Sequence, residues 1–179
     1  MMRKASIQLS VNFLVVMIIC LVLLGIGFKL ISDFVKTGEN LEKGMSDYKK
    51  SQLQRILSSG ALVASYPRTI TISRGDTADF SLGISNELGK DESFVIKVEE
   101  YPNNPVTPEP IKTLYFPGPY PIKNNEQTFT IIRIMTPKNT FHGTYIFDVY
   151  VCNTTIPGEC SRYYTHRYGE IQKLQVDVK

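Results

Sequence analysis

Two cysteines near the C-terminal end are the residues whose spacing points most directly to chemistry. Cys152 and Cys160 flank the turn-rich stretch Asn153-Thr-Thr-Ile-Pro-Gly-Glu159, over which a chain can double back and close a small loop. If this region faces an oxidising exterior, the pair predicts a disulfide. Two free thiols and half of a metal site are the alternatives. The sequence has no CxxC pair and no histidine cluster to favour the metal.

The segment around these cysteines also carries candidate surface chemistry. Asn153-Thr154-Thr155 is an N-glycosylation sequon, which would fit an exposed extracellular loop, although sequons also arise by chance. Beyond Cys160, aromatic and cationic side chains alternate, and such groups bind glycans, polymers or neighbouring subunits by stacking and charge. The candidate interaction patch comprises Arg162, Tyr163, Tyr164, Arg167 and Tyr168. The alternative is an edge strand whose tyrosines cover the end of a sheet while its arginines stay solvated.

The sequence carries no marker of catalysis. His142 and His166 are the two histidines, and neither belongs to a nucleophile or metalloprotease motif such as Gly-x-Ser-x-Gly or His-Glu-x-x-His. A phosphate-binding glycine loop is also missing from the sequence. We therefore expect a protein that is not an enzyme, with no catalytic, cofactor-binding or metal-binding residues and no small-molecule cofactor. A membrane-tethered hydrolase would need a histidine placed beside a carboxylate and a nucleophile.

The charge balance argues against nucleic acid as a partner. Arg3 and Lys4 supply two of the twenty basic residues, so the chain from Lys29 onward holds eighteen basic and seventeen acidic residues. A nucleic-acid-binding domain concentrates Lys and Arg on one face, and this nearly neutral chain has no such cluster.

The N-terminal segment has the composition of a membrane helix. No charged residue occurs from Ala5 to Phe28. At about 1.5 Å per residue this stretch gives roughly 36 Å of helix, enough for a hydrocarbon layer of roughly 30 Å. Arg3 and Lys4 precede it, which predicts a cytoplasmic N-terminus and an exterior C-terminal part. A secretory signal peptide cleaved near Gly25-Ile-Gly27 is the alternative.

An apolar seam continues beyond this run with the spacing of an amphipathic helix. Its members recur mostly three or four residues apart, between charged residues: Ile31, Phe34, Val35, Leu41, Met45, Tyr48, Leu53 and Ile56. Gly38 and Gly44 weaken the helix and predict a break or bend. The expected divisions are a basic leader (1–5), a transmembrane helix (6–31), an amphipathic neck helix (32–60) and an exterior domain (61–179).

These N-terminal residues carry a family resemblance. Arg3-Lys-Ala5, followed by Ser6-Ile-Gln-Leu-Ser-Val-Asn12 and the apolar run, resembles the class III signal and first helix of archaeal type IV pilin-like proteins, including archaellins and archaellum stator proteins. The resemblance implies peptidase cleavage after Lys4 and Ala5, with Ser6 as the new N-terminus. The glutamate that follows a few residues into filament-forming pilins is replaced here by Ser10 or Asn12.

The remaining chain reads as short strands separated by turns. Alternating apolar residues mark strands at 69–73, 78–84, 94–99, 129–135, 144–151 and 173–178. Tyr101 to Pro121 holds seven of the ten prolines, which predicts an irregular crossing loop with at most a short edge strand near Leu114–Phe116. The expected fold class is mainly β: the transmembrane and neck helices followed by an antiparallel, immunoglobulin-like β-sandwich.

Two functions fit this organisation. The first is a non-enzymatic structural protein of the cell envelope, pilin-like or archaellum-stator-like. It would be single-pass in the cell membrane, with membrane lipid, copies of itself or other envelope proteins as partners. The second is a surface receptor or adhesin with the same anchor, which binds a glycan or protein without polymerising.

Overall fold

The computed structural model describes residues 11–43, 46–163 and 165–179. It divides into two compact units, Met1–Glu39 and Asn40–Lys179. The predicted cleavage residues Lys4, Ala5 and Ser6 lie outside the described residues, so the structure does not bear on that prediction.

The first helix, α1, spans Val11–Lys43 and passes through Gly38 without interruption. Its large apolar side chains between Phe13 and Phe28 are 47% to 71% exposed. Among the described residues, no helix meets the length and hydropathy required to cross a membrane.

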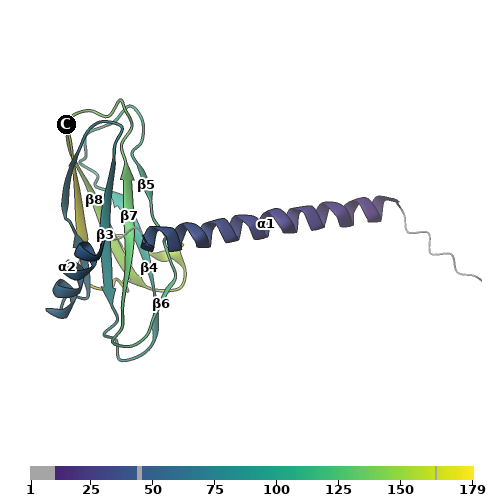
Figure 1. Ribbon diagram of the computed structural model, residues 1–179, viewed down its shortest axis with the longest axis horizontal. Helices are drawn as coiled ribbons and strands as arrows, with labels where there is room; N and C mark the ends of the chain where they lie inside the picture. Colours follow the sequence, from purple (N-terminus) through teal and green to yellow (C-terminus); the bar gives the residue numbers. More distant parts are fainter. Residues whose placement is uncertain (1–10, 44–45, 164) are drawn as a thin grey trace, which may run out of the picture. The chain divides into compact units, whose positions relative to one another are not determined.

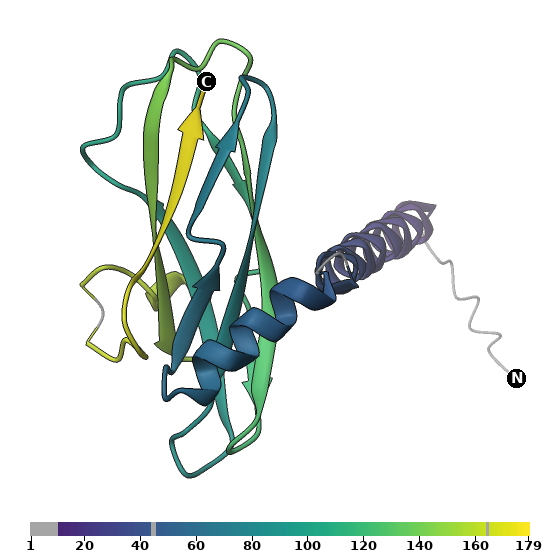
Figure 2. The ribbon, with the colours of Figure 1, turned by 60° about the vertical axis from the view of Figure 1, so that its left-hand side comes forward.

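A second helix, α2, spans Asp47–Ser58 and packs on the β-sheet unit, as Figure 2 shows. Ser46 is its N-cap, because the Ser46 hydroxyl accepts a hydrogen bond from the Lys49 backbone N–H at 3.4 Å. Leu53 and Leu57, four residues apart, point to the sheet and are buried. The expected neck is therefore two helices. The predicted weak point at Gly44 falls between them, outside the described residues.

The strands form two sheets packed face to face (Figure 1). The four-stranded sheet has the order β1-β3-β7-β5 and the five-stranded sheet the order β2-β9-β8-β4-β6. Their bounds are β1 Val63–Tyr66, β2 Thr69–Ile72, β3 Thr77–Ser85, β4 Glu92–Glu100, β5 Lys112–Leu114, β6 Tyr120–Ile122, β7 Gln127–Met135, β8 Gly143–Asn153 and β9 Gln172–Val178.

The prediction of a mainly β chain with two sheets is confirmed, but a purely antiparallel sandwich is wrong in one pairing. β2 runs parallel to β9, with Ile70 opposite Val176, whereas the other strand pairs are antiparallel. The reason is that the chain crosses from one sheet to the other between β1 and β2. β1 therefore pairs with β3 in the four-stranded sheet, and β2 pairs with β9, the last strand of the chain, in the five-stranded sheet.

The core is one apolar layer between the two sheets. Along β3, the side chains of Phe80, Leu82 and Ile84 enter this layer and are fully buried. Their partners from the other sheet include Phe147 and Leu174. This is the alternation that the sequence shows, because successive side chains of a strand point to opposite faces.

Truncating this core should lower the stability of the sandwich strongly. Phe80 is completely buried, so Phe80→Ala should reduce the free energy of unfolding by about 3–5 kcal/mol. Val106 is 87% exposed, so Val106→Ala should change it by less than about 0.5 kcal/mol. Denaturant unfolding of the two variants tests this, and equal losses would contradict the placement of Phe80.

Candidate functional site

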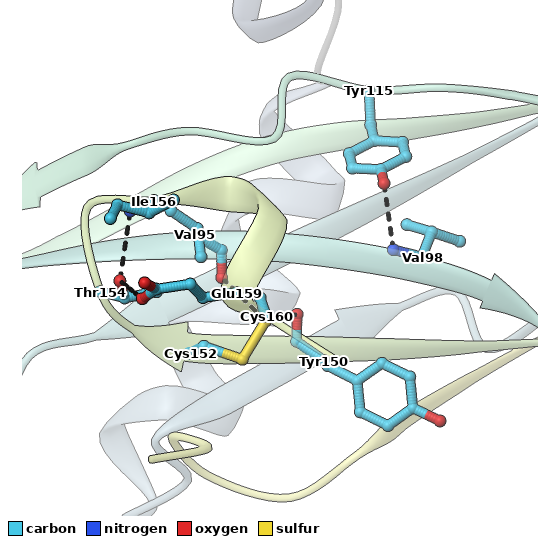
Figure 3. The surroundings of a disulfide bond; sticks show 9 residues. All are labelled: Val95, Val98, Tyr115, Tyr150, Cys152, Thr154, Ile156, Glu159 and Cys160. Carbon is cyan, nitrogen blue, oxygen red and sulfur yellow. Dashed lines mark hydrogen bonds between the residues drawn. A yellow bond between two sulfur atoms is a disulfide. The ribbon is translucent and has the colours of Figure 1, made fainter. Parts of the chain in front are cut away.

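The disulfide predicted from the cysteine spacing is present. Cys152 lies near the end of β8 and Cys160 follows the short 3-10 helix η1 (Pro157–Glu159); the two sulfurs are 2.01 Å apart. Both cysteines are buried and form a small apolar cluster with Val95 and Tyr150 (Figure 3). This cluster lies on the face of the five-stranded sheet that points away from the core, because Val149 and Val151 point into the core.

The segment 153–168, which we call the disulfide loop, folds back along β8. The Asn153 backbone N–H donates to the His166 carbonyl at 3.1 Å, and the Tyr168 N–H donates to the Val151 carbonyl at 2.7 Å. Within the loop, the Thr154 hydroxyl bonds the Glu159 carboxylate at 3.1 Å (Figure 3). The loop is therefore fastened at both ends as well as by the disulfide.

The buried carboxylate of Asp148 also holds the disulfide loop, through an ion pair with Arg162. Only 4% of the Asp148 side chain is exposed. Its two oxygens contact Arg162 Nη2 at 2.8 Å and Lys173 Nζ at 3.0 Å. The Tyr150 hydroxyl donates to Asp148 Oδ2 at 3.2 Å and accepts from Arg162 Nε at 3.0 Å. Arg162 thus ties the disulfide loop to the middle of the five-stranded sheet.

The electrostatics of this cluster follow from burial and hydrogen bonding. Burial raises the pKa of the Tyr150 phenol, although the hydrogen bond from Arg162 opposes that shift. The hydrogen bond to Tyr150, with a further contribution from Asp148, raises the pKa of the Arg162 guanidinium. Lys173 also lies 4.6 Å from the centre of the Tyr101 ring, a cation-π distance. The cluster holds the loop through these contacts, and its described members contain no nucleophile paired with a general base.

The structure does not assemble the predicted patch as one exposed surface. Tyr168 is 7% exposed and packs on Phe94, with ring centres 4.6 Å apart. Its hydroxyl donates to the Ser85 carbonyl at 2.7 Å and accepts from the Glu87 N–H at 2.9 Å. The Arg162 guanidinium is hydrogen-bonded to Asp148 and Tyr150. The segment is irregular, so side chains adjacent in sequence do not share one face.

Two members of that patch remain on the surface. Tyr163 is 87% exposed and Arg167 is exposed, whereas Tyr164 lies outside the described residues. Asn153 is half-buried at the end of β8. The sequon asparagine therefore belongs to a strand rather than to an open loop, and its glycosylation stays a prediction.

His142 and His166 are both exposed, and the residues described by the structure contain no group of three or more potential metal ligands. Sequence reasoning missed Asp148. The sequence does mark this residue, because Asp148 is the one charged residue in the apolar run Tyr145-Ile-Phe-Asp-Val-Tyr-Val151, and a charge there calls for a partner.

A second ionic cluster lies on the outer face of the four-stranded sheet. Asp79 Oδ1 and Oδ2 accept hydrogen bonds from Arg133 Nε and Nη2 at 2.7 and 2.8 Å. Lys49 of α2 donates to the Asp79 carbonyl at 3.0 Å. The Arg133 hydrogen bond holds the pKa of the Asp79 carboxyl below its usual value.

Comparison with known proteins finds weak structural similarity to several solved structures. No protein-family model matches the sequence, and no curated protein matches it. A family 123 glycoside hydrolase from Clostridium perfringens is 17% identical over 63% of this chain, which corresponds to 23% of the enzyme, with a TM-score of 0.36. This chain therefore spans less than a quarter of that enzyme.

Two further solved structures are similar at the same level. A human seminal-plasma complex of Zinc 2-glycoprotein and Prolactin inducible protein contains a chain that is 10% identical; the match covers 66% of this chain and 94% of that one, with a TM-score of 0.40. The Escherichia coli chaperone DraB is 10% identical over 65% of this chain and 54% of its own, with a TM-score of 0.39.

Removing the buried carboxylate should cost far more stability than removing its exposed partner. Asp148→Ala leaves Arg162 Nη2 and the Tyr150 hydroxyl without their acceptor, so we expect a loss of about 2–4 kcal/mol. The Lys173 side chain is 60% exposed, so Lys173→Ala should cost less than about 1 kcal/mol. Chemical denaturation measures both losses, and similar values for the two variants would contradict the central position of Asp148.

Proposed function

We propose that this chain is a non-enzymatic, membrane-anchored structural protein of the cell envelope. In this proposal α1 is a single-pass anchor, the N-terminus is cytoplasmic and the β-sandwich is extracellular, where it contacts other envelope proteins or further copies of the chain. The observation that carries the proposal is the apolar surface of α1. Side chains from Leu14 to Phe28 are apolar on all sides and about half or more exposed, which lipid or neighbouring apolar helices would cover.

The uncharged run on which the anchor rests is longer than the described part of it. In the sequence it extends from Ala5 to Phe28, and its first residues lie outside the described region. Arg3 and Lys4 in front of the run favour a cytoplasmic N-terminus.

The disulfide supports the exterior placement of the sandwich. Disulfides form and persist in oxidising compartments and are rare in the cytosol. Cys152 and Cys160 are bonded and buried, whereas Cys20 of α1 is a free thiol. The oxidised pair therefore fits a sandwich on the far side of the membrane from the N-terminus.

We further propose that the sandwich is immunoglobulin-like. The order β1-β3-β7-β5 corresponds to strands A-B-E-D of that fold, and β9-β8-β4 corresponds to G-F-C. At the start of β8, the Tyr145 hydroxyl donates to the Phe141 carbonyl at 3.0 Å. A tyrosine bonded a few residues back at this corner is a hallmark of immunoglobulin-like domains. β6 departs from the pattern, because it follows β5 in the chain but pairs with β4 in the other sheet.

Within envelope proteins, the pilin-like or archaellum-stator-like assignment rests on the N-terminal resemblance carried by Lys4, Ala5, Ser6 and the apolar run. The receptor or adhesin alternative uses the same architecture. Of the candidate ligand surface of such a receptor, Tyr163 and Arg167 are exposed. Processing of the N-terminus and recovery in filaments discriminate between the two.

The intact mass of the protein from its native membrane tests the proposal. A processed pilin-like subunit would lack residues 1–5, would gain about 2 Da on reduction of the single disulfide, and would remain with the membrane or a filament after alkaline carbonate extraction. A full-length mass in the membrane pellet would favour the anchored receptor. A mass that begins after Gly27, in a soluble fraction, would contradict the anchor.

A further inference from the structure

The four-stranded sheet carries buried apolar side chains on both faces, and the two faces belong to separate apolar clusters. Its inner face contributes to the core between the sheets. Its outer face, with Ala64 and Phe129, forms a second cluster with Leu53 and Leu57 of α2. Because the second cluster shares no buried residue with the first, α2 is attached to the sandwich without contributing to its core.

The seat of α2 on this sheet is closely fitted. A Cβ added to Gly83 would lie 3.0 Å from Leu57 Cδ1 and 3.2 Å from the Phe129 ring. Because Gly83 has no side chain, Leu57 packs directly against β3 at this position. The contact is specific to this helix in this register, and α2 makes it with three apolar side chains: Leu53 and Leu57, which are buried, and Ile56, which is partly buried.

The polar contacts around this seat are weak. Lys49 Nζ donates to the Asp79 carbonyl at 3.0 Å, and Lys50 Nζ lies 5.6 Å from the centre of the Phe129 ring. The Tyr48 and Tyr66 hydroxyls meet at 3.5 Å at an exposed position, which is at the limit for a hydrogen bond. Lys49 is half-buried, so its hydrogen bond is the strongest of these contacts; those of the exposed Lys50 and Tyr48 contribute little to stability.

One buried polar group opposes the docked state. Ser81 is 1% exposed, and its hydroxyl has no hydrogen-bond partner among the described residues. Its neighbours on the strand, Phe80 and Leu82, point into the core, so Ser81 points to the face that α2 covers. Burying a hydroxyl without a partner is unfavourable, and water would solvate it once the helix leaves.

From these observations we infer that α2 is a detachable strap: it leaves its seat on the four-stranded sheet while the sandwich stays folded. Docked, it lies against β1 and β3. Released, its twelve residues lose the packing that stabilises so short a helix, so their amides become open to exchange, and even as a helix they would extend the preceding chain by about 18 Å. Local opening of this kind is expected where an element has few buried contacts of its own. The inference does not depend on the proposed function.

Hydrogen exchange measured by mass spectrometry on the full-length protein in detergent tests the strap. Amides of α2 should exchange at least tenfold faster than those of β7, through openings that leave the sheet protected. Exchange of α2 and β7 at one common rate would show that the helix opens only when the whole domain unfolds, and would overturn the inference.

Two variants with matched controls sharpen the test. Leu57→Ala should speed α2 exchange by about 100-fold and leave β7 within twofold, whereas Gln54→Ala, at an exposed position of α2, should change neither. Ser81→Ala should slow α2 exchange by about tenfold, because the docked state no longer buries an unpaired hydroxyl. Ser93→Ala, on the other sheet, should not. Parallel acceleration of α2 and β7 in Leu57→Ala would contradict the strap, as would an unchanged or faster α2 in Ser81→Ala.

Discussion

The structure depends on the burial of one apolar layer between two β-sheets. Strands β3, β4, β7, β8 and β9 all contribute side chains to it, and those of Phe80, Phe94 and Leu174 are fully buried. Hydrophobic burial of this kind is the dominant favourable term in folding. Each strand has a second face, however, and the outer faces are where this chain differs from a plain sandwich.

Each outer face carries its own attachment. On the four-stranded sheet, α2 covers Ala64 and Phe129. On the five-stranded sheet, the disulfide loop covers Val95 and Tyr150 and is fixed by Arg162 to buried Asp148. The first attachment is apolar with a weak polar rim, whereas the second is held by a covalent bond and an ion pair. The physical difference predicts that α2 opens more readily than the disulfide loop.

Much of the fold could be predicted from the sequence, because period-two patterns such as Phe80, Leu82 and Ile84 report directly on a half-buried strand. β1 shows no such pattern, because Val63, Ala64 and Ser65 are all buried. β6 is not recognisable either, because it has three residues and one of them is Pro121. The disulfide was predicted from the cysteine spacing on the condition of an oxidising exterior, and the structure contains it. The aromatic and cationic patch did not, because Tyr168 turns into the core and Arg162 turns towards Asp148. Partners of that kind are set by the folding of an irregular loop, which local sequence does not specify.

The most direct test of the anchored-sandwich account uses the single free thiol. Cys20 lies in the apolar run of α1, and the other two cysteines are bonded to each other. If α1 spans the membrane, a membrane-impermeant maleimide should leave Cys20 unlabelled in intact cells and label it after denaturation. A Tyr163→Cys variant, altered at a position that is 87% exposed on the sandwich, should label from outside. Full labelling of Cys20 in intact cells, or no labelling of Tyr163→Cys, would contradict the account.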